Sequence, residues 1–134
     1  MYMASRQRLC ILVVDFHKDL VIVTTEMLER LGYLTHGEEE SLKALRAFSE
    51  DPGNFDLAII EPVMPELMGV ELAVRLRRIR RNFPVLFYTG HVDTSLAQSI
   101  EALGLAQPLL GPMGLLEMEA AVDQALFPVR PGIC

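Results

Sequence analysis

Short apolar runs alternate along the chain with longer segments in which apolar residues recur every three or four positions. Apolar runs bounded by turn-forming residues predict strands that are buried on both faces, as in a parallel sheet. We expect these strands at residues 9–14, 33–36, 57–60, 85–88 and 109–110. The helical spacing predicts helices at residues 20–31, 41–48, 70–79, 94–103 and 114–126. This alternation predicts right-handed βαβ units, which form a parallel sheet with helices on both faces.

The chain reads as one domain from end to end. Its 134 residues are enough for a single buried core, and neither an internal repeat nor a domain boundary interrupts the pattern. We expect the folded core at about residues 7–127, with a leader at 1–6 and a Pro-rich tail at 128–134.

Two acidic residues directly follow predicted buried strands. Glu61 comes after four apolar residues, and Asp15 comes after the first apolar run. Pro62 and Pro65 cannot extend a strand, so the chain leaves the sheet after Glu61. Because open α/β sheets carry their functional crevice at the carboxyl ends of the strands, we expect both acids to line it.

Composition and charge exclude several function classes. The net charge of -6 argues against general nucleic-acid binding, and the arginines at 75–81 complement the carboxyl end of a predicted helix. No apolar stretch approaches the ~20 residues of a membrane span. The two cysteines do not form a disulfide framework, because Cys10 lies in an apolar run and Cys134 ends the chain. This cysteine usage favours a cytoplasmic location.

The residues that follow the strands resemble those of a response-regulator receiver domain. The pattern is an acid after the first strand, an acid followed by Met64-Pro65 after the third, Thr89-Gly90 after the fourth and Gly111-Pro112 after the fifth. The segments 28–33, 88–91 and 102–104 are similar to receivers attached to sensor histidine kinases. The resemblance implies a flavodoxin-like (βα)5 fold with strand order 2-1-3-4-5.

The same resemblance implies phosphoryl transfer from a kinase histidine to an aspartate. In this family acidic residues hold Mg²⁺, a hydroxyl hydrogen-bonds the phosphoryl oxygens, and a lysine provides a cationic contact to the phosphoryl group. Asp15 and Thr89 stand where the first acid and the hydroxyl belong. Phe16 replaces the second acid, Glu61 replaces the phosphoacceptor aspartate, and Gly111 replaces the lysine. We therefore expect a remnant acidic pocket of Asp15, Phe16 and Glu61, with weak or absent Mg²⁺ binding at Asp15 and Glu61.

Our hypothesis is a pseudo-receiver, a module that acts by protein–protein interaction without accepting a phosphoryl group. Its expected partners are a histidine kinase, a phosphotransfer domain or a downstream signalling protein, and the family docks them on the region 92–126. A homodimer is compatible with the sequence. We expect neither enzymatic activity, nor direct nucleic-acid binding, nor membrane insertion of this domain.

Four alternatives stay open at this point. Glu61 mimics the phosphorylated state, with Thr89 turned toward it. The domain is still phosphorylated. A transition metal binds His17 and His91 together with the two acids. The chain is a flavodoxin-like hydrolase or phosphotransferase that uses Asp15 and Glu61 as an acid/base pair. A deep pocket that joins both carboxylates would favour the enzyme, and a shallow crevice would favour the binding module.

Overall fold

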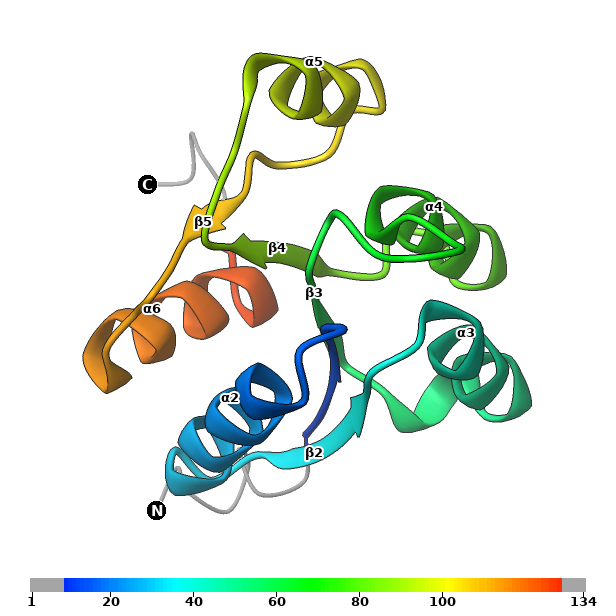
Figure 1. The fold of residues 1–134 in the computed structure, drawn as a ribbon. Coiled ribbons are helices and arrows are strands. Elements are labelled where there is room, and N and C mark those ends of the chain that lie inside the picture. Colours follow the sequence, from blue (N-terminus) through cyan, green and yellow to red (C-terminus); the bar gives the residue numbers. More distant parts are fainter. Residues whose placement is uncertain (1–8, 129–134) are drawn as a thin grey trace, which may run out of the picture.

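The computed structural model describes residues 9–128, in which helices and strands alternate along the chain (Figure 1). The strands are β1 (Cys10–Val14), β2 (Leu34–Glu38), β3 (Leu57–Ile60), β4 (Val85–Thr89) and β5 (Leu109–Leu110). The helices are α2 (Lys18–Arg30), α3 (Ser41–Glu50), α4 (Gly69–Ile79), α5 (Thr94–Ala102) and α6 (Leu115–Leu126), with a 3-10 turn η1 (Pro52–Asn54). The expected leader and nearly all of the expected tail, with Cys134, lie outside the described residues.

The strands form one parallel sheet in the order β2-β1-β3-β4-β5, which confirms the predicted flavodoxin-like topology. β1 and β3 lie in its interior and every residue in them is buried, as their unbroken apolar runs predict. β5 is an edge strand that pairs with β4 only at Tyr88–Leu109 and Thr89–Leu110.

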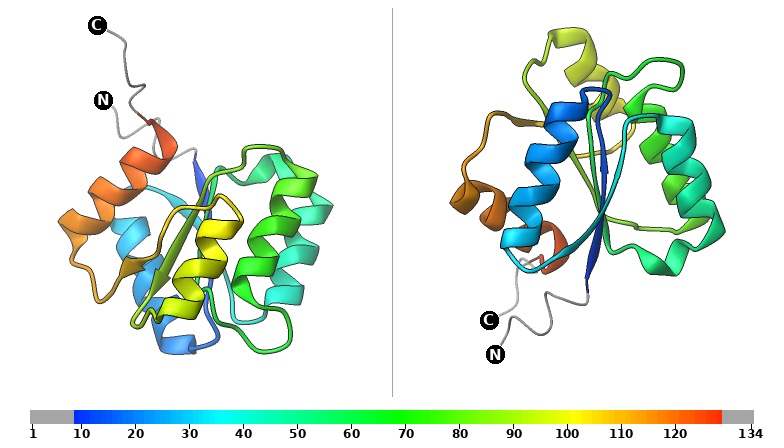
Figure 2. Two further views of the ribbon diagram at one scale, coloured as in Figure 1. Left: turned by 90° about the horizontal axis from the view of Figure 1, so that it is seen from above. Right: turned by 60° about the horizontal axis from the view of Figure 1, so that its bottom comes forward.

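Helices cover both faces of the sheet (Figure 2). Helices α3, α4 and α5 cover one face, where Leu12 and Ile60 share a core with Phe48 and Leu76. Helices α2 and α6 cover the other face, where alternate strand residues meet Leu28, Met118 and Val122. None of the helices described for residues 9–128 combines the length and apolar character needed to cross a membrane.

The start of helix α4 is pressed against the end of β3. A Cβ atom on Gly69 would lie 1.9 Å from the backbone oxygen of Glu61 and 2.8 Å from Cγ2 of Ile60. Glycine is therefore needed here for a close approach between a helix and a strand. The contact fixes where the chain returns after it leaves the sheet at Glu61.

Two local features differ from the sequence predictions. The second strand begins at Leu34 and extends to Glu38, because it pairs in register with the full length of β1. In helix α2 the buried residues are Thr24 and Leu28, whereas Leu20 is 47% exposed and Val23 is 51% exposed. The apolar stripe of α2 that includes Leu20 and Val23 thus lies beside the core.

Candidate functional site

Asp15 follows β1 and is buried, at 8% exposure. Its Oδ1 accepts a hydrogen bond from the backbone N–H of His17 at 2.9 Å and lies 3.1 Å from Nδ1 of the His17 ring. The turn that starts helix α2 therefore fixes one oxygen of this carboxylate. Asp15 thus lies at the carboxyl edge of the sheet, where the sequence predicted it.

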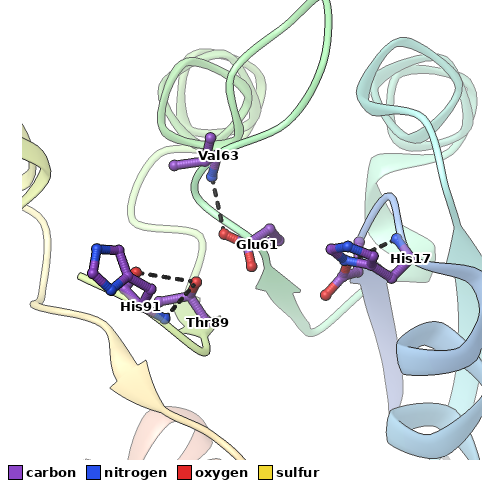
Figure 3. Close-up of polar contacts among 6 residues, drawn as sticks. His17, Glu61, Val63, Thr89 and His91 are labelled. Carbon is purple, nitrogen blue, oxygen red and sulfur yellow. Dashed lines mark hydrogen bonds and ion pairs between the residues drawn. The ribbon is translucent and has the colours of Figure 1, made fainter. Parts of the chain in front are cut away.

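Glu61 follows β3 and is equally buried, at 8% exposure. Its backbone N–H donates to the Val14 oxygen at 2.8 Å, which continues the pairing with β1 and brings the two acids to one edge. Its Oε2 accepts from the Val63 N–H at 3.1 Å (Figure 3). Burial raises the pKa of the Glu61 carboxyl and the Asp15 carboxylate adds to this, while the Val63 hydrogen bond, the Thr89 hydroxyl and His17 lower it.

The Thr89 side chain ends β4 beside Glu61. Its hydroxyl donates to the His91 oxygen at 3.3 Å and accepts from the His91 N–H at 3.4 Å, and it lies close enough to Glu61 to lower that pKa (Figure 3). The His91 ring lies on the far side of Thr89 from Glu61 (Figure 3). The hydroxyl is thus on the side of the acids, as the mimic hypothesis requires.

Phe16 follows Asp15 directly, but its side chain does not line the recess that holds the two acids. It is 41% exposed, and its ring packs on the His17 ring with centroids 4.0 Å apart.

Gly111 lies against the ring of Tyr88. A Cβ atom on Gly111 would approach Cε1 and Oη of Tyr88 to 2.8 and 2.9 Å. The Tyr88 hydroxyl also accepts a hydrogen bond from the Met113 N–H at 2.9 Å, which holds the ring in place. Tyr88 therefore occupies the space into which a longer side chain at 111 would extend, and no feature of the sequence pattern pointed to this role.

A recess of about 360 Å³ opens at this edge of the sheet, between helix α2 and the segment that follows β5. Its lining comes from Asp15 and Glu61, from helix α2, from the end of β4 and from residues 111–113. We call it the α2–β5 recess. It joins the two predicted acids with Thr89 and Gly111, while Phe16 and both histidines lie outside its lining.

This edge offers Mg²⁺ two carboxylates, and the backbone N–H groups of His17 and Val63 each hold one oxygen of them. Mg²⁺ takes octahedral oxygen ligands and is commonly held by one or two carboxylates together with water or phosphate oxygens. Within residues 9–128 no three His, Cys, Asp or Glu side chains are grouped to hold a metal ion. Asp15 and Glu61 are therefore the residues that would hold the ion.

We expect Glu61→Gln to stabilise the protein at neutral pH. Because burial raises the pKa of the folded carboxyl, the native state binds this proton more tightly than the unfolded chain does. The cost of the charged carboxylate is thus absent at low pH and grows as pH rises from about 4.3, the unfolded value, through the folded pKa. Urea unfolding across this pH range should show that the free energy of unfolding of the variant, relative to that of the natural protein, increases as pH rises.

The matched control for this measurement is Glu101→Gln, because Glu101 is exposed on helix α5. Its stability difference from the natural protein should change little with pH. A Glu61→Gln difference that is equally independent of pH would contradict the raised pKa.

Comparison with known proteins places these features in context. The family model of the response regulator receiver domain matches residues 11–123. The chain is 28% identical over 117 residues to the response regulator receiver protein CpdR of Brucella abortus, a match that covers 87% of this chain and 96% of that protein. It is 30% identical over 132 residues to the virulence sensor protein BvgS of Bordetella pertussis, covering 90% of this chain but 10% of that protein.

Solved structures give the same result. A response regulator receiver domain protein from Clostridium thermocellum superimposes with a TM-score of 0.80 at 25% sequence identity, covering 88% of this chain and 94% of that one.

Proposed function

Because the chain belongs to the response regulator receiver domain family, we propose that it is a pseudo-receiver, which binds a signalling protein without accepting a phosphoryl group. Receiver domains are modules of two-component signalling, and this family membership accounts for the fold and for the edge that carries the acids. The proposal concerns what the altered residues at that edge still do.

The observation that carries the proposal is that Glu61 and Gly111 line the same recess. Glu61 stands where the resemblance puts the phosphoacceptor aspartate, and Gly111 stands where it puts the lysine. A glutamate carboxylate lies one methylene farther out, and a displacement of about 1 Å from the reactive geometry costs on the order of 100-fold in rate. Gly111 offers no cation for the transferred charge, and Tyr88 fills the space that a longer side chain would need.

The second acid is also missing from the site. Phe16 stands in its place and faces solvent, so Asp15 and Glu61 are the two acids that this edge offers to a metal ion. The assignments of Glu61 as the acceptor-equivalent position, Thr89 as the switch hydroxyl and Gly111 as the lysine-equivalent position are part of the proposal.

The proposed partners are a histidine kinase, a phosphotransfer domain or a downstream signalling protein in the cytoplasm. They would dock on the face formed by α5, β5 and α6. Exposed apolar side chains lie in or directly after these elements, at Leu103, Leu110, Leu116 and Phe127. Leu116 is 78% exposed, and exposed apolar side chains of this kind suit a protein interface. A homodimer through the same face belongs to the same proposal.

The test is the intact mass of the protein after incubation with Mg²⁺ and acetyl phosphate. We expect the natural protein to gain no phosphoryl group. Glu61→Asp is run alongside because it moves the carboxylate back by one methylene, and Glu101→Asp serves as an exposed control. Incorporation by Glu61→Asp alone would identify Glu61 as the block, whereas incorporation by the natural protein would overturn the proposal and identify a working receiver.

One observation favours a second candidate, a hydrolase or phosphotransferase. The α2–β5 recess joins both carboxylates, as an acid/base pair would require. Against this, neither His17 nor His91 lines the recess, so no imidazole base faces the hydroxyls of Thr24, Tyr88 and Thr89 that do. Free phosphate released in the same acetyl phosphate incubation measures this activity, and we expect none above the buffer rate.

A further inference from the structure

The α2–β5 recess combines apolar walls with buried carboxylates. Its volume of about 360 Å³ falls in the range of roughly 300 to 1,000 Å³ typical of small-molecule sites. Most of its lining side chains are apolar, and they come from helix α2, from β4 and from the segment after β5: Leu20, Val23, Met27, Tyr88, Pro112 and Met113.

The apolar side chains of helix α2 that line the recess are partly exposed to solvent. Leu20 is 47% exposed and Val23 is 51% exposed, although both belong to the apolar stripe of the helix. Apolar surface that converges on a recess loses contact with water when a ligand fills it, which is a favourable change. The stripe therefore provides contact area for an apolar group of limited size.

The charges in the recess are negative. Asp15 and Glu61 line it, and no lysine or arginine of the described part of the chain forms an ion pair with either. Asp15 is paired through Oδ1 with the His17 ring at 3.1 Å, and Glu61 is hydrogen-bonded by the Val63 N–H and lies beside the Thr89 hydroxyl. A buried carboxylate is stabilised by a cation that donates hydrogen bonds to it.

We propose that the α2–β5 recess binds a small organic cation, an amine on an apolar body, with the ammonium group at Asp15 and Glu61. The apolar body lies against Val23 and Met27 on one side and Met113 on the other. An anionic ligand would be repelled by the two acids, and a neutral one would gain no charge attraction from them. The site uses the acids of the proposed pseudo-receiver, but binding requires neither the presence nor the absence of phosphoryl transfer.

Gly111 contributes no cation to the recess. A lysine at this position would place a cation close to the acids, whereas here the Tyr88 ring packs against Gly111. The ligand ammonium thus supplies a positive charge that no lysine or arginine of the described residues supplies here. Methionine side chains on both walls adapt to apolar bodies of different shape.

The probe for this site is phenethylamine, compared with phenethyl alcohol, which has a similar shape and no charge. Binding is followed by NMR of methionine methyl groups. Met27 and Met113 line the recess, while Met64 is buried in the core on the other face of the sheet and serves as an internal reference. We expect saturable shifts at Met27 and Met113, unchanged Met64, and binding of the amine about tenfold or more tighter than the alcohol.

Two variants on helix α2 test the location. Val23→Phe fills the recess and should weaken amine binding on the order of tenfold or more. Ile22→Phe is the matched control, because Ile22 is 42% exposed on the same helix and does not line the recess. Glu61→Gln tests the charge, and it should bring the affinity for the amine down toward that for the alcohol.

These outcomes are independent of the phosphorylation test, which uses no amine, so failure of the amine site can be distinguished from failure of the pseudo-receiver proposal. Absence of saturable shifts at Met27 and Met113 would overturn the site. Equal binding by Val23→Phe and Ile22→Phe would overturn its location. Equal affinity for amine and alcohol would overturn the assignment to a cation, and a Glu61→Gln protein that keeps the full preference for the amine would overturn the placement of the ammonium at Glu61.

Discussion

Gly69→Ala is expected to lower the free energy of unfolding by about 3 kcal/mol or more, since overpacking of rigid groups reaches or exceeds this range. An alanine Cβ at this position would lie 1.9 Å from the backbone oxygen of Glu61. The new Cβ and the backbone oxygen of Glu61 are both rigidly attached to the main chain, so helix α4 or the end of β3 has to move to relieve the collision. The usual effect of Gly→Ala in a helix has the opposite sign, a gain of roughly 0.5 to 1 kcal/mol.

Urea unfolding followed by circular dichroism measures the loss in free energy of unfolding of Gly69→Ala. A variant that shows no cooperative transition would also confirm strong destabilisation. The matched control is Gly90→Ala, because a Cβ at Gly90 meets no atom within 4 Å and Gly90 lies at the same edge of the sheet. We expect the control to stay within about 0.5 kcal/mol of the natural protein. A Gly69→Ala protein with the stability of the control would show that helix α4 does not press on Glu61.

Gly111→Lys is expected to destabilise the protein by about 1 to 3 kcal/mol, because its first side-chain atom collides with the Tyr88 ring. The collision involves Cε1 and Oη of Tyr88 at 2.8 and 2.9 Å, and moving the ring also breaks its hydrogen bond with Met113. In a Tyr88→Ala background the same lysine meets free space and should cost much less. The two changes should therefore couple by about 1 kcal/mol or more.

The four proteins of this double-mutant cycle are compared by urea unfolding, with Gly90→Lys as the control for adding a lysine at this edge. If the effects at 111 and 88 add to within about 0.5 kcal/mol, Tyr88 does not block position 111. Coupling of the expected size would mean that position 111 accepts a lysine only when the Tyr88 ring is removed.

The architecture was predictable from the sequence because each element carries its own local signal. The apolar runs of β1 and β3 lie between turn-forming residues, and buried parallel strands need that pattern. Asp15 and Glu61 were predicted to meet because parallel strands end at one edge of the sheet, and both are buried there at 8% exposure. The strand order came from the family resemblance and is confirmed.

The details of the site were not predictable, since they depend on contacts between distant segments. Periodicity places Leu20 and Val23 on an apolar stripe of helix α2, but it cannot tell a core face from the wall of a recess. The contact of Tyr88 with Gly111 joins residues far apart in the chain, and nothing in either neighbourhood signals it. Phe16 was expected inside the pocket as a bulky apolar residue, yet the turn into α2 directs it to solvent beside His17.

The shortness of β5 makes the two walls of the α2–β5 recess unequal. One wall is carried by the 13 residues of helix α2, and the other follows a strand of two residues at the edge of the sheet. Segments with few backbone hydrogen bonds open locally at lower free energy than the interior of a helix. We therefore expect local opening, and with it amide hydrogen exchange, to be faster on the β5 side than on helix α2.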